Sequence, residues 1–178
     1  MTVEPGVTNL EISRCVEKLG LYYAPDPSSQ QVCSIGGNVA ENSGGAHCLK
    51  YGFTVHHVMA LEMVLPDGEL IRIGGKSVDT PGLDLLGIIV GSEGTLGIVT
   101  KVTVRLLRRP ESKKMLIAAF DSPDLAGAAV SGIIAAGIIP AAVEMMDRMT
   151  MEAAESAVHP NFPNAEALLL VEIDGPLL

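Results

Sequence analysis

The sequence predicts an α+β fold built from two structural units that meet near Pro110. Two glycine-rich segments lie beside strand-like segments before Pro110, whereas the pattern after it is strand, helix, strand, helix, strand. The charge changes at the same place. Half of the 12 basic residues fall between positions 101 and 114, and residues 115–178 hold nine acids and one base. We therefore expect one unit at residues 1–110 and a second at 111–178.

The composition of the 178-residue chain is that of a globular protein. Hydrophobic residues make up 48% and charged residues 19%, which excludes intrinsic disorder. Aromatic residues supply 3% and there is no Trp, so the core must be aliphatic and no stacking platform for single-stranded nucleic acid is available. The net charge of −9 argues against a polyanionic partner, and we expect no nucleic-acid binding.

The first expected elements are short. A brief extended run covers Thr2–Glu4, and Thr8 followed by Glu11 has the spacing of a capping box. The capping box predicts a helix that runs through Leu19 and ends at Gly20. Pro25–Ser29 contains two prolines one residue apart and is expected to be an irregular turn.

A β-hairpin and a further strand are predicted in the rest of the first unit. Met59–Leu65 and Leu70–Ile73 flank a Pro-Asp-Gly turn, which is typical of a hairpin. The run Gly97–Leu107 alternates between apolar and basic residues, which predicts a half-buried strand. Its expected buried face is Ile98, Thr100, Val102, Val104 and Leu106.

The second unit is predicted as a sheet with helices on one face. Strands are expected at Met115–Phe120, Ala141–Met146 and Ala167–Ile173. A helix begins after Ser122-Pro123 and lasts to about Gly137, because proline is favoured in the first turn of a helix. A second helix is expected at Arg148–Ala157. We interpret the four methionines of this region as core residues: Met145, Met146, Met149 and Met151.

Cysteine spacing and the chain ends point to a cytoplasmic protein. Cys15, Cys33 and Cys48 form no CxxC pair, so neither a disulfide framework nor a zinc site is expected. The N-terminal residues have no signal-peptide pattern, and no apolar stretch is long and unbroken enough to cross a bilayer. Both ends of the sequence resemble cuts through a longer protein.

The two glycine-rich segments, residues 34–45 and 91–97, are candidate sites for a phosphate-containing ligand. They match neither the P-loop nor the GxGxxG dinucleotide fingerprint. Glycine nevertheless allows backbone N–H groups to converge on an anion and to approach it closely. Each segment alone favours a structural turn over a ligand site. The two segments together, with Asn38, Asn42 and Glu93 among their glycines, favour the two explanations about equally. The basic residues among positions 101–114 also have two explanations. They are a solvated strand edge and linker, or a surface that faces an anionic cofactor or a missing part of the protein.

Two longer motifs carry a resemblance to a known family. Residues 25–52, PDPSSQQVCSIGGNVAENSGGAHCLKYG, together with residues 91–100, GSEGTLGIVT, closely resemble the FAD-linked oxidases. These have the vanillyl-alcohol oxidase, or PCMH-type, flavin fold. The sequence is most similar to the branch that holds the flavin-binding chain of the bacterial glycolate oxidases and the D-lactate dehydrogenases. The resemblance covers essentially the whole chain, including residues 143–148.

The resemblance implies that the chain binds FAD non-covalently. Pro27, Ser28, Ser29 and Ser34 would follow the flavin and its ribityl-diphosphate, and Gly36, Gly37 and Asn38 would form a turn at the diphosphate. The adenosine diphosphate would be lined by Ala40, Glu41, Asn42 and Ser43. The adenine end would be wrapped by Glu93, Gly94, Thr95, Leu96, Gly97, Ile98 and Val99. We expect the two segments, 28–43 and 93–99, to form the walls of one groove.

The resemblance also sets expectations for the whole protein. Residues 1–110 would be the second subdomain of the FAD-binding domain, and residues 111–178 the first part of an α/β cap domain. The parent enzyme would oxidise a small 2-hydroxy acid, of the glycolate or D-lactate type, to the 2-oxo acid. Iron–sulfur or second flavin subunits would accept the electrons, and would place the enzyme peripherally at the inner membrane. The motifs identify neither catalytic residues nor metal ligands in this chain.

Two other interpretations remain open. The chain could be a truncated, non-catalytic module that binds flavin weakly and dimerises, or a different flavin enzyme such as an enolpyruvyl sugar reductase. Residues 34–45 and 143–148 argue against the reductase. Family members carry a first FAD loop and a histidine-containing cap element that this sequence lacks. We therefore expect the chain alone to bind FAD poorly, to lack turnover and to self-associate.

The remaining histidines are interpreted as structural. His56 and His57 are adjacent, which on a strand would direct them to opposite faces and prevent them from sharing a metal. His47 and Lys50 lie inside the flavin-like motif and could approach the ring, but a structural role explains them as well.

Overall fold

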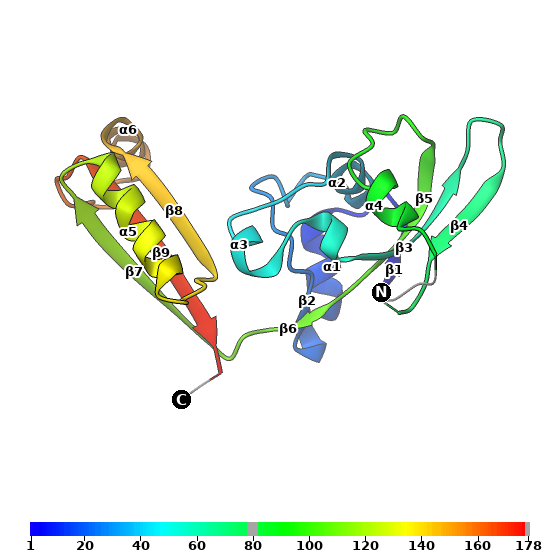
Figure 1. The fold of residues 1–178 in the computed structure, drawn as a ribbon, viewed down its shortest axis with the longest axis horizontal. Coiled ribbons are helices and arrows are strands. Elements are labelled where there is room, and N and C mark those ends of the chain that lie inside the picture. Colours follow the sequence, from blue (N-terminus) through cyan, green and yellow to red (C-terminus); the bar gives the residue numbers. More distant parts are fainter. Residues whose placement is uncertain (78–81, 177–178) are drawn as a thin grey trace. The chain divides into compact units, whose positions relative to one another are not determined.

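The computed structural model describes residues 1–77 and 82–176, and they form two compact units, Met1–Arg109 and Pro110–Leu178 (Figure 1). Helices and sheets occur in both units, so the predicted α+β fold class is confirmed. Among the residues so described, no helix has the length and apolar character needed to cross a bilayer.

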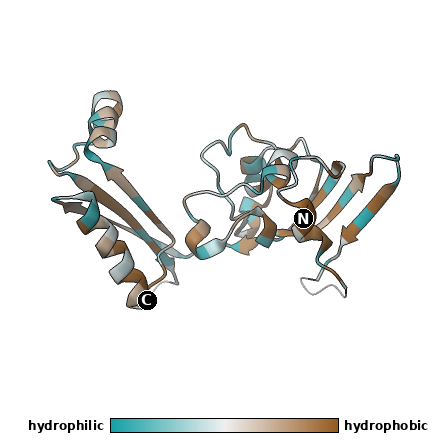
Figure 2. Ribbon diagram, turned by 45° about the horizontal axis from the view of Figure 1, so that its top comes forward, coloured by the Kyte–Doolittle hydropathy of each residue, from teal (hydrophilic) through white to brown (hydrophobic). Residues whose placement is uncertain are grey.

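The first unit contains a four-stranded antiparallel sheet. Its order is β1 (Thr2–Val3), β5 (Ile98–Val104), β3 (Val58–Val64) and β4 (Leu70–Gly74). Figure 2 shows mostly hydrophobic residues along these strands, interrupted by hydrophilic ones. Strands β3 and β4 form the predicted hairpin, in which Val64 pairs with Leu70 around the Pro-Asp-Gly turn. The other predicted strand of this unit is β5.

The buried face predicted for β5 is partly wrong because a β-bulge interrupts the strand. Glu62 pairs with Lys101 and Met63 pairs with Val99, so Thr100 is an extra residue with no partner of its own. A one-residue bulge reverses which side chains face the core. Val102 and Val104 are buried as predicted, but Val99 packs against the core in place of Ile98, which is 72% exposed.

The first helix is shorter than predicted. Helix α1 covers Asn9–Val16, a 3₁₀ turn η1 continues over Glu17–Leu19, and Gly20 ends it with a φ of 69°. Thr8 occupies the N-cap position, but its side chain makes no capping hydrogen bond, so the expected capping box is absent. The chain entering α1 is held by tertiary contacts, since the amide of Asn9 donates to the carbonyl of Cys33.

The glycine-rich segment 34–45 begins with a helix and not with the predicted turn. Helix α2 covers Ile35–Glu41, and the Ser34 side chain caps it by accepting a hydrogen bond from the amide of Gly37. The connections of this unit contain further short elements: β2 (Leu21–Tyr22), α3 (Cys48–Tyr51), η2 (Thr54–His56), α4 (Leu85–Ile89) and β6 (Leu107–Arg108).

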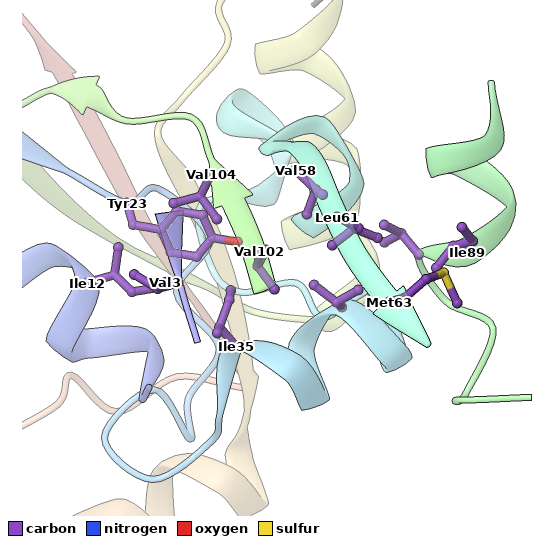
Figure 3. Close-up of a cluster of buried hydrophobic side chains, with 12 residues drawn as sticks. Val3, Ile12, Tyr23, Ile35, Val58, Leu61, Met63, Ile89, Val102 and Val104 are labelled. Atoms are coloured by element: carbon purple, nitrogen blue, oxygen red, sulfur yellow. The ribbon is translucent and has the colours of Figure 1, made fainter. Parts of the chain in front are cut away.

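The core of the first unit lies between the sheet and helices α1, α2 and α4 (Figure 3). Ile12 from α1 and Ile35 from α2 are fully buried, as is Val102 from β5. Tyr23 is the aromatic residue of this cluster, and burial raises the pKa of its hydroxyl. The rest of the cluster is aliphatic, as the composition predicts.

The second unit matches the predicted order of elements. Its sheet has the antiparallel order β7 (Ser112–Phe120), β9 (Ala167–Gly175) and β8 (Ala142–Asp147). Helix α5 (Pro123–Ala135) is capped by Ser122, as predicted, and packs against β9 through Ala126. Helix α6 (Arg148–Val158) follows β8 directly and is capped by the Asp147 carboxylate.

The interpretation of the four methionines as core residues is wrong for two of them. Met151 is buried, but Met145 is 52% exposed and Met149 is 79% exposed. Met145 lies on β8, an edge strand with a neighbour on one side only, and Met149 lies in the first turn of α6.

The face of the first sheet that points away from the core carries a network of charged and polar side chains, which stabilises the sheet. The Glu62 carboxylate contacts Arg72 at 2.7 Å and Lys101 at 3.1 Å, and the Thr100 hydroxyl lies 3.1 Å from it. The hydrogen bond from Arg72, followed by that from Lys101, lowers the pKa of Glu62 to about 2.

We expect this network to make folding stability depend on pH. A carboxylate whose pKa is lowered by folding stabilises the fold above its unfolded pKa, and the contribution is lost as the pH falls from about 4.5 towards about 2. Glu62→Gln should lower the thermal unfolding midpoint at pH 7 by a few degrees, and the difference from the unsubstituted chain should vanish near pH 2. Glu69→Gln, on the same hairpin but exposed, is the control. A deficit that stays constant with pH would contradict the role of this charge.

Candidate functional site

The two glycine-rich segments line one groove of about 500 Å³ in the first unit. Helices α2 and α4 lie near the beginning of β5 in Figure 1, and residues from these elements line the groove. The first segment contributes residues from Ser34 to Ala40 and the second contributes residues from Ser92 to Val99. The two segments therefore form walls of one groove, as the sequence predicts.

Hydrogen bonds join the second segment directly to the end of α2. The amide of Gly91 donates to the carbonyl of Val39 at 2.8 Å, and the amide of Glu93 donates to that of Ala40 at 2.9 Å. Both carbonyls belong to the last turn of a helix, where partners within the helix run out. That of Val39 also accepts a hydrogen bond from the amide of Asn42 at 3.4 Å. The turn at residues 91–94 thus caps α2, which fixes the two walls relative to each other.

The amides at the beginning of α2 are already used within the chain. Those of Ile35 and Gly36 donate to the carbonyls of Val7 and Pro5, and that of Gly37 donates to the Ser34 hydroxyl. A Cβ atom on Gly36 would lie 2.7 Å from Cβ of Pro5. The prediction of a turn at Gly36 and Gly37 is therefore wrong, because both residues lie in α2. Their contact with a diphosphate stays a prediction.

The groove offers backbone donors at other positions. The amides of Gly6, Gly94 and Gly97 have no hydrogen-bond partner among residues 1–77 and 82–176. Gly94 has a φ of 73° and Gly97 a φ of 152°, conformations that favour glycine. A groove with unpaired N–H groups and no side chains at these positions suits an anionic oxygen.

The rest of the lining is apolar. Val39 from α2 and Ile89 from α4 are buried, whereas Ile98 and Val99 at the beginning of β5 remain partly or largely exposed. A planar, weakly polar ring can be covered by such aliphatic side chains. The groove therefore combines a surface for a ring with donors for phosphate oxygens.

The structure places the predicted cofactor residues in two groups. Those that line the groove are Ser34, Gly36, Gly37, Ala40, Gly94, Gly97, Ile98 and Val99. Those that lie outside its lining are Pro27, Ser28, Ser29, Asn38, Glu41, Asn42, Ser43, Glu93, Thr95 and Leu96. Sequence reasoning does not find the further lining residues Pro5, Gly6, Val39, Ile89 and Ser92.

Asn38 is buried in the first unit and does not line the groove. Its carbonyl accepts a hydrogen bond from the amide of Ser43 at 3.0 Å. Its side-chain nitrogen is buried and has no hydrogen-bond partner within the described chain. Asn42, in a left-handed conformation with φ of 50°, ends α2 and accepts a hydrogen bond from the amide of Val55.

The adjacent histidines have structural roles, although they do not lie on a strand. His56 ends the 3₁₀ turn η2, and its Nδ1 accepts a hydrogen bond from the amide of Phe53. His57 is 2% exposed, and its Nε2 lies 2.8 Å from the carbonyl of Tyr51. Burial lowers the pKa of His57, which keeps the imidazole neutral.

His47 pairs with Asp26, which lies in the turn at residues 25–29, directly before the predicted cofactor residue Pro27. Nδ1 of His47 lies 2.6 Å from the Asp26 carboxylate, and both side chains are about four-fifths buried. A Cβ atom on Gly45 would lie 2.3 Å from the carbonyl oxygen of Asp26, so this pairing requires glycine at position 45. The pair connects the turn at residues 25–29 to the segment after α2.

Three of the basic residues at positions 101–114 form ion pairs within their own units. Lys101 pairs with Glu62, Arg109 with Glu17 and Lys113 with Glu172. These contacts give Lys101, Arg109 and Lys113 a structural role on the surface. No group of three or more His, Cys, Asp or Glu side chains within residues 1–77 and 82–176 is placed to hold a metal ion.

Comparison with family models and with known proteins agrees with the two units. Residues 1–74 match the FAD binding domain family, and residues 109–177 match the family of FAD linked oxidases, C-terminal domain. A relative with 56% identity over 174 residues is the glycolate oxidase subunit GlcD of Escherichia coli (strain K12), with 97% of this chain and 35% of that protein covered.

A second relative and one solved structure extend the comparison. The D-lactate dehydrogenase of Anaerostipes hadrus is 37% identical over 147 residues, covering 82% of this chain and 31% of that protein. A structure of alkyldihydroxyacetonephosphate synthase has a TM-score of 0.83 at 22% identity, over 98% of this chain and 35% of that one, and shows the shared fold. The chain spans about a third of the length of these relatives.

Proposed function

The chain belongs to the FAD-linked oxidase family, and from that premise we propose that its groove holds the adenosine diphosphate portion of FAD. The observation that carries the proposal is the joining of the two glycine-rich walls by the Gly91–Val39 and Glu93–Ala40 hydrogen bonds. It brings the apolar residues and the unpaired amides of Gly6, Gly94 and Gly97 to one place. Apart from the buried Pro27 and Asn38, the predicted residues outside the lining would contact parts of the cofactor beyond this groove.

We further propose that the whole protein oxidises a small 2-hydroxy acid to the 2-oxo acid. The support is the similarity to a glycolate oxidase subunit and to a D-lactate dehydrogenase. Bound FAD would supply the acceptor for the hydride that leaves the hydroxyl-bearing carbon. The residues of this chain would hold and orient the cofactor, with residues 1–110 as part of the FAD-binding domain and 111–178 as part of the cap.

Partner subunits are part of the same proposal. The relative from Escherichia coli is named as a subunit, which supports an assembly in which another subunit accepts the electrons. Such a partner would carry an iron–sulfur centre or a second flavin. We propose a cytoplasmic location, with any attachment to the inner membrane made through those subunits.

A flavin-fluorescence titration of the purified chain tests the cofactor site. We expect weak binding of FAD, with a Kd above about 10 µM, because the chain spans about a third of the relatives' length. ADP should displace FAD and riboflavin should not, since the groove is proposed to hold the adenosine diphosphate. Displacement by riboflavin but not by ADP would contradict the assignment.

The chain alone is expected to show no turnover. Its visible spectrum with added FAD should not bleach under anaerobic conditions when glycolate or D-lactate is added. A yellow monomer that bleaches with either acid would show that the chain contains a complete active site, contrary to the proposal.

A further inference from the structure

An aspartate–histidine pair joins the turn at residues 25–29 to the segment that follows α2. In this turn Asp26 precedes Ser28 and Ser29, two exposed residues predicted to contact the cofactor outside the groove lining. Nδ1 of His47 lies 2.6 Å from Oδ2 of Asp26, and the amide of His47 donates to Oδ1 of Asp26 at 3.5 Å. The side chains of His47 and Asp26 are 21% and 23% exposed, so water screens their contact less than it screens a surface pair.

Glycine at position 45 allows the turn and this segment to touch. A Cβ atom on Gly45 would lie 2.3 Å from the carbonyl oxygen of Asp26 and 2.4 Å from its Oδ1. The chain then turns back towards Asp26, because the amide of Cys48 donates to the carbonyl of Gly45 at 3.2 Å and the amide of Gly45 lies 2.9 Å from Sγ of Cys48. The backbone at position 45 thus takes part in the contact together with the side chains of Asp26 and His47.

The two ends of the turn are attached to a different element, helix α1. The side-chain nitrogen of Asn9, a residue that is 1% exposed, donates to the carbonyl of Pro25 at 2.9 Å. The amide of Leu10 donates to the carbonyl of Gln30, just after the turn, at 2.9 Å. The residues between these two attachments are connected to the segment after α2 through Asp26. The turn therefore bridges α1 and the end of α2.

The pair can act on a ligand only through the segments that it joins. Within residues 1–77 and 82–176, the groove lining includes neither Asp26 nor His47. Segments that are already held in place do not have to be ordered when a ligand binds, and this raises the affinity for that ligand. FAD consists of adenosine diphosphate and a riboflavin part. With its adenosine diphosphate in the groove, FAD has only the riboflavin part left to contact residues outside the lining.

We propose that Asp26 and His47 are positioning residues for FAD. Their contact fixes Ser28 and Ser29 relative to α2, which carries one wall of the groove, so that these serines receive the riboflavin part of the cofactor. Neither Asp26 nor His47 has to touch the cofactor. This inference rests on the proposed function, because it requires the adenosine diphosphate to occupy the groove. ADP alone does not extend beyond the groove, so the pair affects the binding of FAD and not that of ADP.

Equilibrium dialysis of the chain against FAD and, separately, against ADP tests the proposal, at ligand concentrations from about 10 µM to about 1 mM. The unsubstituted chain should bind FAD more tightly than ADP. His47→Ala should raise the dissociation constant of FAD at least about fivefold and that of ADP less than about twofold. His47→Asn should restore most of the FAD affinity, because its side-chain NH₂ group can donate to Asp26 from nearly the position of Nδ1.

His56→Ala is the matched control, because it makes the same change at an exposed position of the same unit. Both dissociation constants should then change less than about twofold. Gly45→Ala tests the contact by a second route, since it keeps Asp26 and His47 and inserts a methyl group between the two segments. It should weaken the binding of FAD selectively, and it supplies the comparison if His47→Ala does not fold. Circular dichroism shows whether each variant is folded.

The outcomes separate this inference from the proposed function. If the unsubstituted chain binds no ADP, the assignment of the groove fails, and the role of the pair fails with it. If ADP binds and His47→Ala leaves the affinity for FAD unchanged, the groove assignment stands and the role of the pair is overturned. If His47→Ala weakens the binding of FAD and ADP equally, the pair only stabilises the fold, and the proposal is overturned in the same way.

Discussion

Gly97→Ala is expected to lower the free energy of unfolding by about 2–5 kcal/mol and to weaken FAD binding by the chain. Gly97 has a φ of 152°, which strains an L-residue. An added Cβ would lie 2.5 Å from Cε of Met63 and 2.6 Å from the carbonyl oxygen of Val64. The strand would have to move away from β3 at the point where it lines the groove. Urea unfolding and the FAD titration measure the two effects.

Gly94→Ala is the matched control for this substitution. Gly94 also has a positive φ, of 73°, but an added Cβ would have nothing within 4 Å. The substitution should therefore lower the free energy of unfolding through backbone strain alone, by about 1–2 kcal/mol. Equal losses of stability in the two variants would show that close packing against β3 is not what requires glycine at position 97.

Ile35→Ala is expected to destabilise the chain by about 2–5 kcal/mol, because it leaves a cavity beneath α2. Ile35 is 0% exposed and packs in the core of the first unit, and α2 carries one wall of the groove. The binding of FAD should weaken in parallel. Val32→Ala removes two methyl groups three positions earlier, from a side chain that is 79% exposed, and should change stability by less than about 0.5 kcal/mol. Chemical unfolding of both variants makes the comparison.

Local signals account for what can be predicted from the sequence. The Pro-Asp-Gly turn determines the β3–β4 hairpin, and Ser122-Pro123 determines the beginning of α5. After Pro110, the strands and helices predicted from local patterns have bounds close to those of the observed elements. Each of these signals involves residues only a few positions apart, so it can be recognised from the sequence alone.

Features that depend on distant contacts cannot be predicted in this way. Gly36 and Gly37 are poor helix formers, yet they lie in α2, whose first amides are held by the carbonyls of Pro5 and Val7. The bulge at Thr100 likewise exists only when β5 pairs with β3. For the same reason no local signal assigns Pro5 and Gly6, about 30 residues before α2, to the groove.

Amide chemical shifts during an FAD titration of the ¹⁵N-labelled chain test the proposed site most directly. The largest changes should occur at Gly6, Gly94 and Gly97, whose amides line the groove without a partner in the described chain. Ile98 and Val99 should shift with them, and the second unit should change little. Shifts concentrated in residues 110–176, or on the sheet face around Glu62 and Lys101, would contradict the assignment of the groove to FAD.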